Sequence, residues 1–301
     1  MPVAWRYASR RSYDVVVSSS HACAKGFWPG RRALHLCYCY TPMRYVWLSS
    51  LDRRREPDPI TLLGERVLRS WDLRSVEWVD EFAAISNAVR NRIEYIYHRP
   101  SRVIHPPVDT DFYTPGDSSE RRDFAVAVSR LVPYKRLDLA VRACRAMNMP
   151  LKVAGWGPEE AALRSLAGSI GADVEFITAP TDEMLRDLFR SARLSLFPAE
   201  EDFGIVAVES QACGTPVVAL GRGGSLDTVV DGETGVHVAE QTAEDMAEGI
   251  KAVLDGSMLP ESCRRNAERF STATFRREFG DWVQAAAAKA GIELSSANNH
   301  L

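Results

Sequence analysis

The chain of 301 residues lacks several features that would place it in a specialised class of protein. No apolar run approaches the roughly 20 residues that cross a bilayer, and no apolar signal-peptide core follows Met1. Hydrophobic residues make up 46% and charged residues 26%, which excludes a disordered or collagen-like chain. These absences predict a soluble, cytoplasmic protein. At roughly 100–200 residues per domain, the length predicts two domains.

Cysteine is scarce, and its spacing forms no metal motif. Among the six cysteines only Cys37 and Cys39 lie two residues apart, and no second pair completes a zinc site. We therefore expect reduced structural thiols and no metal. The sequence contains no helix-turn-helix, zinc-finger or RNP motif, so nucleic acid is not an expected partner.

Charge is distributed unevenly, although the formal net charge is only −3. Residues 1–55 carry ten Lys or Arg against two Asp, a local excess of eight positive charges. Such an excess favours an anionic partner. The partner is either a phosphate group or an anionic membrane surface, which the basic N-terminal region would contact peripherally at the inner face. The alternative is a basic face that is only solvated.

Short apolar runs typical of buried strands alternate with helical segments along most of the chain. Apolar runs occur at Tyr13–Ser20, Ala33–Tyr40, Phe82–Ser86, Phe124–Val128, Leu151–Ala154, Val174–Ile177, Leu194–Phe197, Val217–Leu220 and Val236–Val238. Helices are predicted at Glu65–Ala84, Asn87–Tyr97, Leu137–Met147, Pro158–Ala167, Thr181–Ser191, Gly204–Cys213 and Ala243–Leu254. This alternation predicts an α/β fold of doubly wound parallel sheets, with ligands at the carboxyl ends of the strands.

A polar segment at 117–123 marks the expected domain boundary. We expect an N-terminal domain at 1–118, a C-terminal domain at 119–285 and a polar tail at 286–301. A complete doubly wound domain rarely fits in fewer than about 120 residues. We therefore expect the first domain to lack one or two leading strand–helix units.

The strongest candidate site is the motif PAEEDFGIVAVE, which ends at Glu209. Its glycine, Gly204, lies at a strand-to-helix turn, so the amides of Gly204 and Ile205 can face an anion. Glu201 precedes the helix and Glu209 lies within it, so the two carboxylates can contact different parts of one ligand. The structural alternative is that Glu201 only complements the helix dipole and that Glu209 is a solvated helix residue.

Three further strand ends carry loops that suit an anion. Arg130 and Lys135 follow one strand and can close on a diphosphate, Arg by bidentate hydrogen bonds and Lys as a point charge. Gly155 and Gly157 form a tight turn after the next strand, and a glycine-rich segment at 221–225 follows another. Four loops of this kind at four strand ends are hard to explain as coincidence and favour an anionic ligand.

The motifs SRLVPYKRLDLAV, AGWGPEE, LFPAEEDFGIVAVESQACGTPVVAL and GRGGSLDTVVDGETG follow one another in this order. In order and spacing they resemble the nucleotide-sugar-binding domain of the retaining glycosyltransferase family four. That resemblance implies the GT-B fold, in which two Rossmann-like domains face a cleft, with the first one incomplete here. Upstream, YDVVVSSSHACAKG, YCYTPMRYVW and RVIHPPVDTDFY resemble a mannosyltransferase-like branch.

The resemblance implies a metal-independent hexosyltransferase with no cofactor. It would move a hexosyl group, plausibly mannose, with retention from a GDP- or UDP-linked sugar to a glycan or lipid-linked acceptor, as in polysaccharide biosynthesis. Arg130 and Lys135 would neutralise the leaving diphosphate. Glu201 would lie at the donor sugar, and Glu209 would hold the ribose hydroxyls.

The resemblance also places Gly155 and Phe203 on the donor side, with the amides of Gly204 and Ile205 at the sugar or phosphate. The acceptor would bind to the first domain.

Two residues of the first domain are catalytic candidates. Tyr40 occupies the position at which this branch usually has histidine, and a phenol is a poor proton shuttle at neutral pH. His21 ends a predicted strand, and its alternative role is structural. These departures leave two other functions open. One is a catalytically impaired remnant or scaffold that binds a nucleotide sugar and needs a partner. The other is a nucleotide-sugar epimerase, which would form product from the donor alone.

Overall fold

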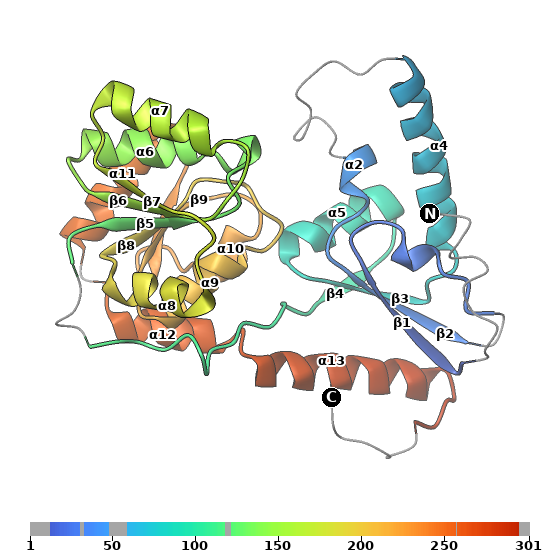
Figure 1. Cartoon of the computed structure of the whole chain (residues 1–301). Helices are drawn as coiled ribbons and strands as arrows, with labels where there is room; N and C mark the ends of the chain where they lie inside the picture. The colour runs from blue at the N-terminus through green and yellow to red at the C-terminus, as the bar shows by residue number, and fades with distance from the viewer. Residues whose placement is uncertain (1–12, 31–32, 48–58, 118–121, 257, 295–301) are drawn as a thin grey trace. The chain divides into compact units, whose positions relative to one another are not determined.

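The computed structural model describes residues 13–30, 33–47, 59–117, 122–256 and 258–294 (Figure 1). The chain divides into two compact units. The first comprises Met1–His105 with Phe275–Leu301, and the second comprises Pro106–Thr274. Each unit is built on one sheet in which every strand pair is parallel. The α/β class that the alternation predicted is therefore confirmed.

This division differs from the predicted boundaries at 118 and 285. The last helix, α13 (Thr272–Lys289), packs against the first unit instead of extending the second. Tyr38 lies edge-on to the rings of Phe275 and Phe279, at 5.7 and 5.6 Å between centroids. Trp282 is fully buried, and its indole N–H donates to Glu81 at 3.2 Å. The aromatic side of α13 thus decides to which unit the end of the chain belongs.

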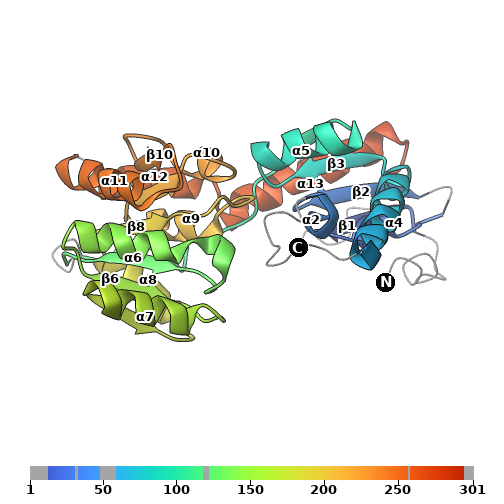
Figure 2. The same cartoon turned by 90° about the horizontal axis from the view of Figure 1, so that it is seen from above.

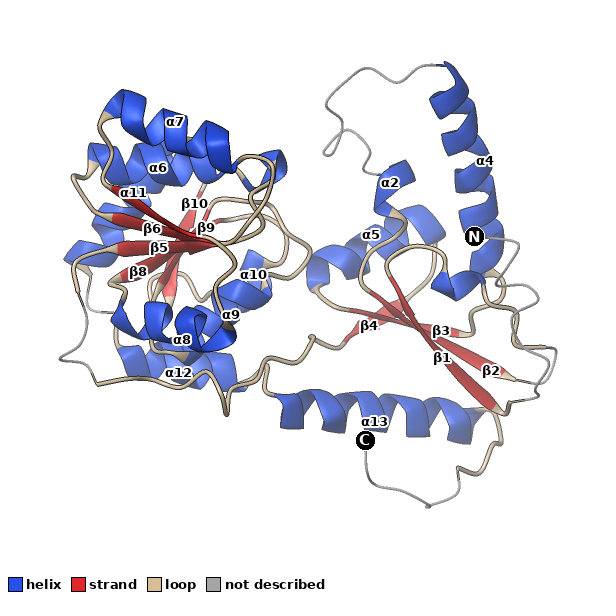
Figure 3. Cartoon of the chain, in the orientation of Figure 1, coloured by secondary structure: helices blue, strands red, loops and turns tan. Residues whose placement is uncertain are grey.

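The sheet of the first unit has the strand order β1-β2-β3-β4. Its elements are β1 (Val15–Ser20), β2 (Leu34–Cys39), β3 (Glu81–Ala84) and β4 (Ser101–Val103), with a short 3₁₀ turn η1 (Ala24–Gly26) and the helices α2 (Arg44–Trp47), α4 (Pro59–Val76) and α5 (Asn87–Tyr97). Figure 3 shows α13 along one face of this sheet and α5 on the other. The sheet is thus covered on both faces, as parallel sheets require.

The predicted helix at Glu65–Ala84 is wrong at both ends. The helix α4 begins at Pro59 and ends at Val76, and residues 81–84 form β3. The Asp80 carboxylate accepts the His35 amide at 2.7 Å, and the Asp80 amide donates to the His35 carbonyl at 2.8 Å. These two hydrogen bonds align the chain beside β2. Because they join residues far apart in the sequence, the apolar spacing of the predicted helix could not indicate them.

The sheet of the second unit has six strands in the order β10-β9-β8-β5-β6-β7. They are β5 (Ala125–Val128), β6 (Leu151–Ala154), β7 (Val174–Ile177), β8 (Leu194–Phe197), β9 (Val217–Leu220) and β10 (Gly235–Val238). All six predicted segments form strands with ends within one residue of the expected ones. β8 and β9 are buried throughout, as the continuous apolar runs predicted.

Helices cover both faces of this second sheet. The helices α6 (Leu137–Ala146), α7 (Glu160–Ile170) and α11 (Ala243–Asp255) lie on one face, and α8 (Asp182–Ser191), α9 (Ile205–Ala212), α10 (Ser225–Thr228) and α12 (Pro260–Glu268) on the other (Figures 1 and 2). From β5 the chain proceeds outward through β6 to β7, then returns to build β8, β9 and β10 on the opposite side of β5. The strand order therefore reverses between β5 and β8, which is where doubly wound sheets bind ligands.

Candidate donor site on the second unit

The four loops predicted to bind an anion follow four adjacent strands. Segments 129–136, 155–157, 198–204 and 221–224 follow β5, β6, β8 and β9, which are consecutive in the sheet order β9-β8-β5-β6. All pairs are parallel, so the carboxyl ends of these strands meet at one edge. The tertiary structure thus brings the four loops together around the point where the strand order reverses.

Lys135 and Glu201 meet across that point. Lys135 ends the short 3₁₀ turn η3 (Pro133–Lys135) after β5, and Glu201 lies in the loop after β8. The Lys135 ammonium forms an ion pair with the Glu201 carboxylate. The two side chains are 14% and 21% exposed, so solvent still reaches the pair. Glu201 is therefore a partner of Lys135 and does more than complement the dipole of α9.

Arg130 differs from Lys135 in its partner. Its side chain is exposed, and its guanidinium lies 5.6 Å from the centre of the Trp156 ring. No carboxylate pairs with Arg130 in the part of the chain that the structure describes. Among the described residues, the positive charge of Arg130 is thus not neutralised by a carboxylate.

Gly204 starts α9 with a left-handed backbone, φ +94°. A Cβ there would approach the Phe197 ring to 3.0 Å, which adds a steric reason for glycine at this turn. Ile205, the first helical residue, is 43% exposed. Phe203 is buried, with its ring 5.5 Å from that of Phe270. The Phe203 side chain therefore belongs to the core, and a donor contact from this predicted residue would have to come from its backbone.

The glycine-rich loop after β9 supports the acidic loop. The amide of Gly224 donates to the carbonyl of Glu201 at 2.7 Å, and Glu201 and Gly223 form an isolated parallel bridge. A Cβ on Gly224 would lie 2.2 Å from the Phe203 Cα. The loop that the sequence predicted to suit an anion thus makes a close backbone approach to the neighbouring loop.

Glu209 lies on α9 and is mostly withdrawn from solvent. Burial, with a smaller contribution from the negative charge of Asp182, raises the pKa of Glu209 to about 7. The alternative of an ordinary solvated helix residue is therefore wrong, because a glutamate carboxyl group in bulk water has a pKa near 4.5.

Tyr113 is a neighbour of Glu209 that the sequence did not single out. Its pKa is raised by burial and then by the negative charges of Glu209 and Asp182. Tyr113 ends the segment RVIHPPVDTDFY, but that motif gives it no role, because its proximity to Glu209 arises only on folding.

The two catalytic candidates of the first unit lie beside each other along the sheet edge. Ser20 of β1 pairs in register with Cys39 of β2, so His21 and Tyr40 are the next residues at neighbouring strand ends. His21 is exposed, and the Tyr40 hydroxyl accepts from the Ser19 hydroxyl at 3.1 Å. Both side chains are accessible at the carboxyl edge of their own sheet.

Of the basic residues in the N-terminal region, the structure describes Lys25 and Arg44. The others lie outside the described residues. Lys25 is fully buried and forms an ion pair with the equally buried Asp72. It therefore does not contribute to a basic surface, which corrects that part of the prediction.

Two features are absent from the described residues. None of their helices combines the length and apolar character needed to span a bilayer. Nor do three or more of their His, Cys, Asp or Glu side chains gather in a way that would hold a metal ion.

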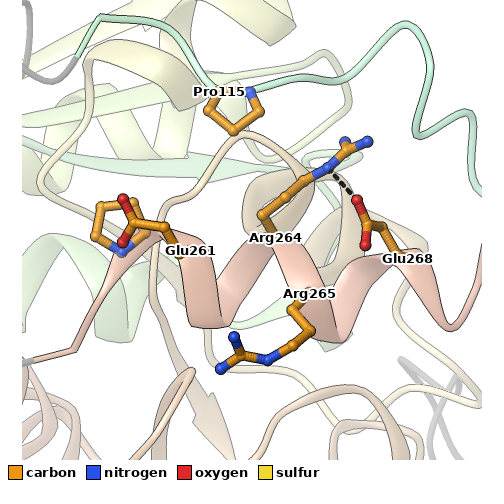
Figure 4. Close-up of a pocket in the computed structure, with 6 residues that line it drawn as sticks. Pro115, Glu261, Arg264, Arg265 and Glu268 are labelled. Atoms are coloured by element: carbon orange, nitrogen blue, oxygen red, sulfur yellow. Dashed lines mark hydrogen bonds and ion pairs between the residues drawn. The ribbon is translucent and has the colours of Figure 1, made fainter.

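A surface pocket lies elsewhere on the second unit, lined by residues of α12 and by Pro115 (Figure 4). The Arg264 guanidinium in its wall donates to the carbonyls of Thr110 and Tyr113 at 2.7 and 2.8 Å and pairs with Glu268. Arg264 thus holds the segment that enters the second unit. This pocket contains none of the predicted donor-side residues.

Comparisons with known proteins match this site to one family. The model of the family "Glycosyl transferases group 1" matches residues 114–270. The D-inositol 3-phosphate glycosyltransferase of Mycolicibacterium smegmatis is 34% identical over 289 residues, which cover 87% of this chain and 64% of the relative. The enzyme of that name from Mycobacteroides abscessus is 38% identical over 194 residues, 58% of this chain and 42% of the relative. The chain thus spans less than two thirds of the length of these relatives.

Solved structures confirm the two-domain architecture. Sucrose-phosphate synthase from Thermosynechococcus elongatus superposes with a TM-score of 0.76 at 20% identity, covering 95% of this chain and 76% of that one. HepE from Anabaena, in complex with UDP-glucose, superposes with a TM-score of 0.70 at 18% identity, covering 91% and 79%. At such identities the likeness concerns the fold.

Proposed function

Because the chain belongs to the glycosyl transferases group 1, we propose that it transfers a hexosyl group from a nucleoside diphosphate sugar to an acceptor hydroxyl, with retention of configuration. The observation that carries the proposal is the ion pair of Lys135 and Glu201 at the reversal point of the second sheet, with the exposed Arg130 in the same loop as Lys135. Two cations there suit a diphosphate, and a carboxylate beside them suits the hydroxyls of a sugar.

In this reaction the bond between the anomeric carbon and the β-phosphate oxygen breaks, and the acceptor oxygen bonds to the same carbon. The proton of the acceptor hydroxyl passes to the departing diphosphate. Arg130 and Lys135 bind the diphosphate, whose charge grows as it leaves, and supply the electrostatic stabilisation without a metal ion. Gly155 and the first amides of α9, at Gly204 and Ile205, lie on the donor side. Glu209 accepts hydrogen bonds from the ribose hydroxyls.

The donor is linked to UDP or GDP, and the transferred sugar is mannose in the branch that the sequence resembles. The acceptor binds to the first unit, where His21 and Tyr40 are the accessible polar groups at the strand ends. A glycan or lipid-linked acceptor is the first candidate. The names of the mycobacterial relatives support inositol 3-phosphate as the second.

The basic N-terminal region and the helix α4 that follows it make a peripheral contact with an anionic membrane at the cytoplasmic face. Support comes from α4, which exposes Leu62, Leu63 and Val67 together with Arg66. Apolar side chains beside a cation suit an interface of acyl chains and anionic headgroups. Co-sedimentation with phosphatidylglycerol vesicles, but not with phosphatidylcholine vesicles, is expected, and Val67→Glu should weaken it. If the natural chain and Val67→Glu sedimented equally with phosphatidylglycerol and with phosphatidylcholine vesicles, the membrane contact would be contradicted.

The experiment that tests the main proposal has two steps. Calorimetric titration with GDP, UDP and ADP identifies the base, and the matching sugar donors are then incubated with and without an acceptor. Transfer that requires the acceptor supports the enzyme. Product from the donor alone would indicate an epimerase, and nucleotide binding without turnover would indicate the inactive remnant or scaffold. No binding of any nucleotide would overturn the donor site.

A further inference from the structure

The loop after β6 presents an exposed tryptophan between two glycines. Trp156 is 58% exposed, although aromatic side chains of this size usually bury most of their surface. Gly155 and Gly157 have φ values of +145° and +158°, which L side chains rarely adopt. The exposed ring is thus held by a backbone shape that the two glycines alone permit.

This loop is fixed against the loop that carries Arg130. A Cβ on Gly155 would lie 1.9 Å from the Ser129 carbonyl oxygen, and one on Gly157 would lie 2.3 Å from that of Leu131. The amide of Leu131 donates to the carbonyl of Trp156 at 2.9 Å. The two backbones therefore touch on both sides of the Arg130–Trp156 pair, and the central side chain of each loop lies beside that of the other.

The ring holds Arg130 without neutralising it. The guanidinium is 5.6 Å from the ring centre, within the range of a cation–π contact. A carboxylate partner, such as Glu201 provides for Lys135, would cancel the charge and occupy N–H groups. An aromatic face attracts the cation and leaves its N–H groups available to a bidentate anion.

We propose that Trp156 is a positioning residue that holds the Arg130 guanidinium ready for the diphosphate of the donor. The proposal rests on the proposed function. A long, exposed arginine loses rotamer freedom when it binds a ligand, and a residue that restricts it beforehand reduces that loss. Trp156 acts through Arg130, so its contribution disappears when the guanidinium is absent.

The test is a double-mutant cycle measured by calorimetry with UDP and GDP as probes. Trp156→Ala should weaken binding about two- to fivefold, the worth of an exposed cation–π contact. Trp156→Phe should restore most of the affinity, since it keeps a ring. In the Arg130→Gln background, Trp156→Ala should cause no further loss. Arg186→Gln is the matched control, because Arg186 stacks on Phe112 at 4.9 Å but belongs to α8, outside the four loops.

Three results would overturn the inference. An affinity of Trp156→Ala that equals or exceeds that of the natural chain would show that the ring does not prepare Arg130. Losses that multiply in the double variant would show that Trp156 acts on the nucleotide independently, for example by stacking on the base. Failure of Trp156→Phe to recover binding would indicate a loop disturbed by the substitution. If the natural chain bound neither nucleotide, the proposed function itself would fail.

Discussion

The Lys135 ammonium and the Glu201 carboxylate form an ion pair across the point at which the strand order of the second sheet reverses. In the absence of a ligand the two groups therefore satisfy each other. A diphosphate that binds Lys135 competes with Glu201 for the same cation. Because of this competition, substitutions of Lys135 and of Glu201 should change the affinity for the nucleotide in opposite directions.

Removal of the cation should weaken nucleotide binding. Lys135→Ala should raise the dissociation constant of the nucleoside diphosphate by about 10- to 100-fold, because a hydrogen bond to a charged group contributes about 1.5–3 kcal/mol. Lys135→Arg, which keeps the charge, should lose less. Calorimetric titration checks both variants, and an unchanged affinity of Lys135→Ala would remove Lys135 from the diphosphate site.

Removal of the carboxylate charge should separate binding from transfer. Glu201→Gln leaves Lys135 without its anionic partner, so the affinity for the free nucleoside diphosphate should stay equal or increase. The rate of sugar transfer should fall by a larger factor, because the sugar loses a charged acceptor. Titration and a transfer assay on the same preparation measure the two effects. Equal losses in both would contradict a role on the sugar side.

The raised pKa of Glu209 predicts a specific dependence of stability on pH. In the folded chain this pKa is about 7, above its usual value of 4.5, so protonated Glu209 favours the folded state. That contribution is complete below about pH 4.5 and is lost as the pH rises through 7. Glu209→Gln should therefore match the natural chain in stability at pH 4 and exceed it at pH 8, by at most about 3 kcal/mol. Thermal melts of both proteins across this pH range check the prediction. A difference in stability that does not change with pH would contradict it.

Binding of a nucleoside diphosphate sugar should also depend on whether Glu209 is protonated. Ribose hydroxyls donate to the ionised carboxylate, so affinity for a nucleoside diphosphate sugar should increase from pH 6 to pH 8. The Glu209→Gln variant should show a flatter profile. Equal slopes in both proteins would argue against a ribose contact at this residue.

The buried pair in the first unit predicts a large loss of stability. Lys25 and Asp72 are 1% and 0% exposed, and the Asp72 carboxylate also accepts from the Trp47 indole and the Tyr97 hydroxyl, both at 2.8 Å. Lys25→Met leaves a buried carboxylate without its cation and should cost about 3–5 kcal/mol. Urea denaturation measures this loss in the free energy of unfolding.

An exposed ion pair of the same type provides the control. Arg164 pairs with Glu160 one turn earlier on α7, and Arg164→Gln should cost at most about 0.5 kcal/mol. The double variant Lys25→Met with Asp72→Asn should be less destabilised than Lys25→Met alone. Similar costs for Arg164→Gln and Lys25→Met would contradict the importance of the buried pair.

Tyr40 allows a test of the catalytic side of the first unit. Its side chain is accessible, and its hydroxyl accepts a hydrogen bond from the Ser19 hydroxyl. A histidine there, with a pKa near 6.5, transfers protons more readily at neutral pH than a phenol does. Tyr40→His should therefore increase transfer, while Tyr40→Phe should decrease it. Rates that are the same in all three proteins would exclude Tyr40 from the reaction.

Much of the second unit could be predicted from local sequence, because each of its elements has a short-range cause. Buried parallel strands such as β8 and β9 are continuous apolar runs, and α8 begins where the Thr181 hydroxyl accepts the Met184 amide. The four loops at the strand ends followed from the same alternation. Residue types alone therefore indicated a phosphorylated ligand at the carboxyl edge of a parallel sheet.

Contacts between residues that are distant in the chain could not be predicted from local sequence patterns. The pairing of Lys135 with Glu201 and of Lys25 with Asp72 spans 66 and 47 residues, and the raised pKa of Glu209 needs its burial and Asp182. The packing of α13 on β2 likewise moved the boundary between the units. Strand order, burial and the choice of ion-pair partners depend on how the whole chain packs, so tertiary structure decided them.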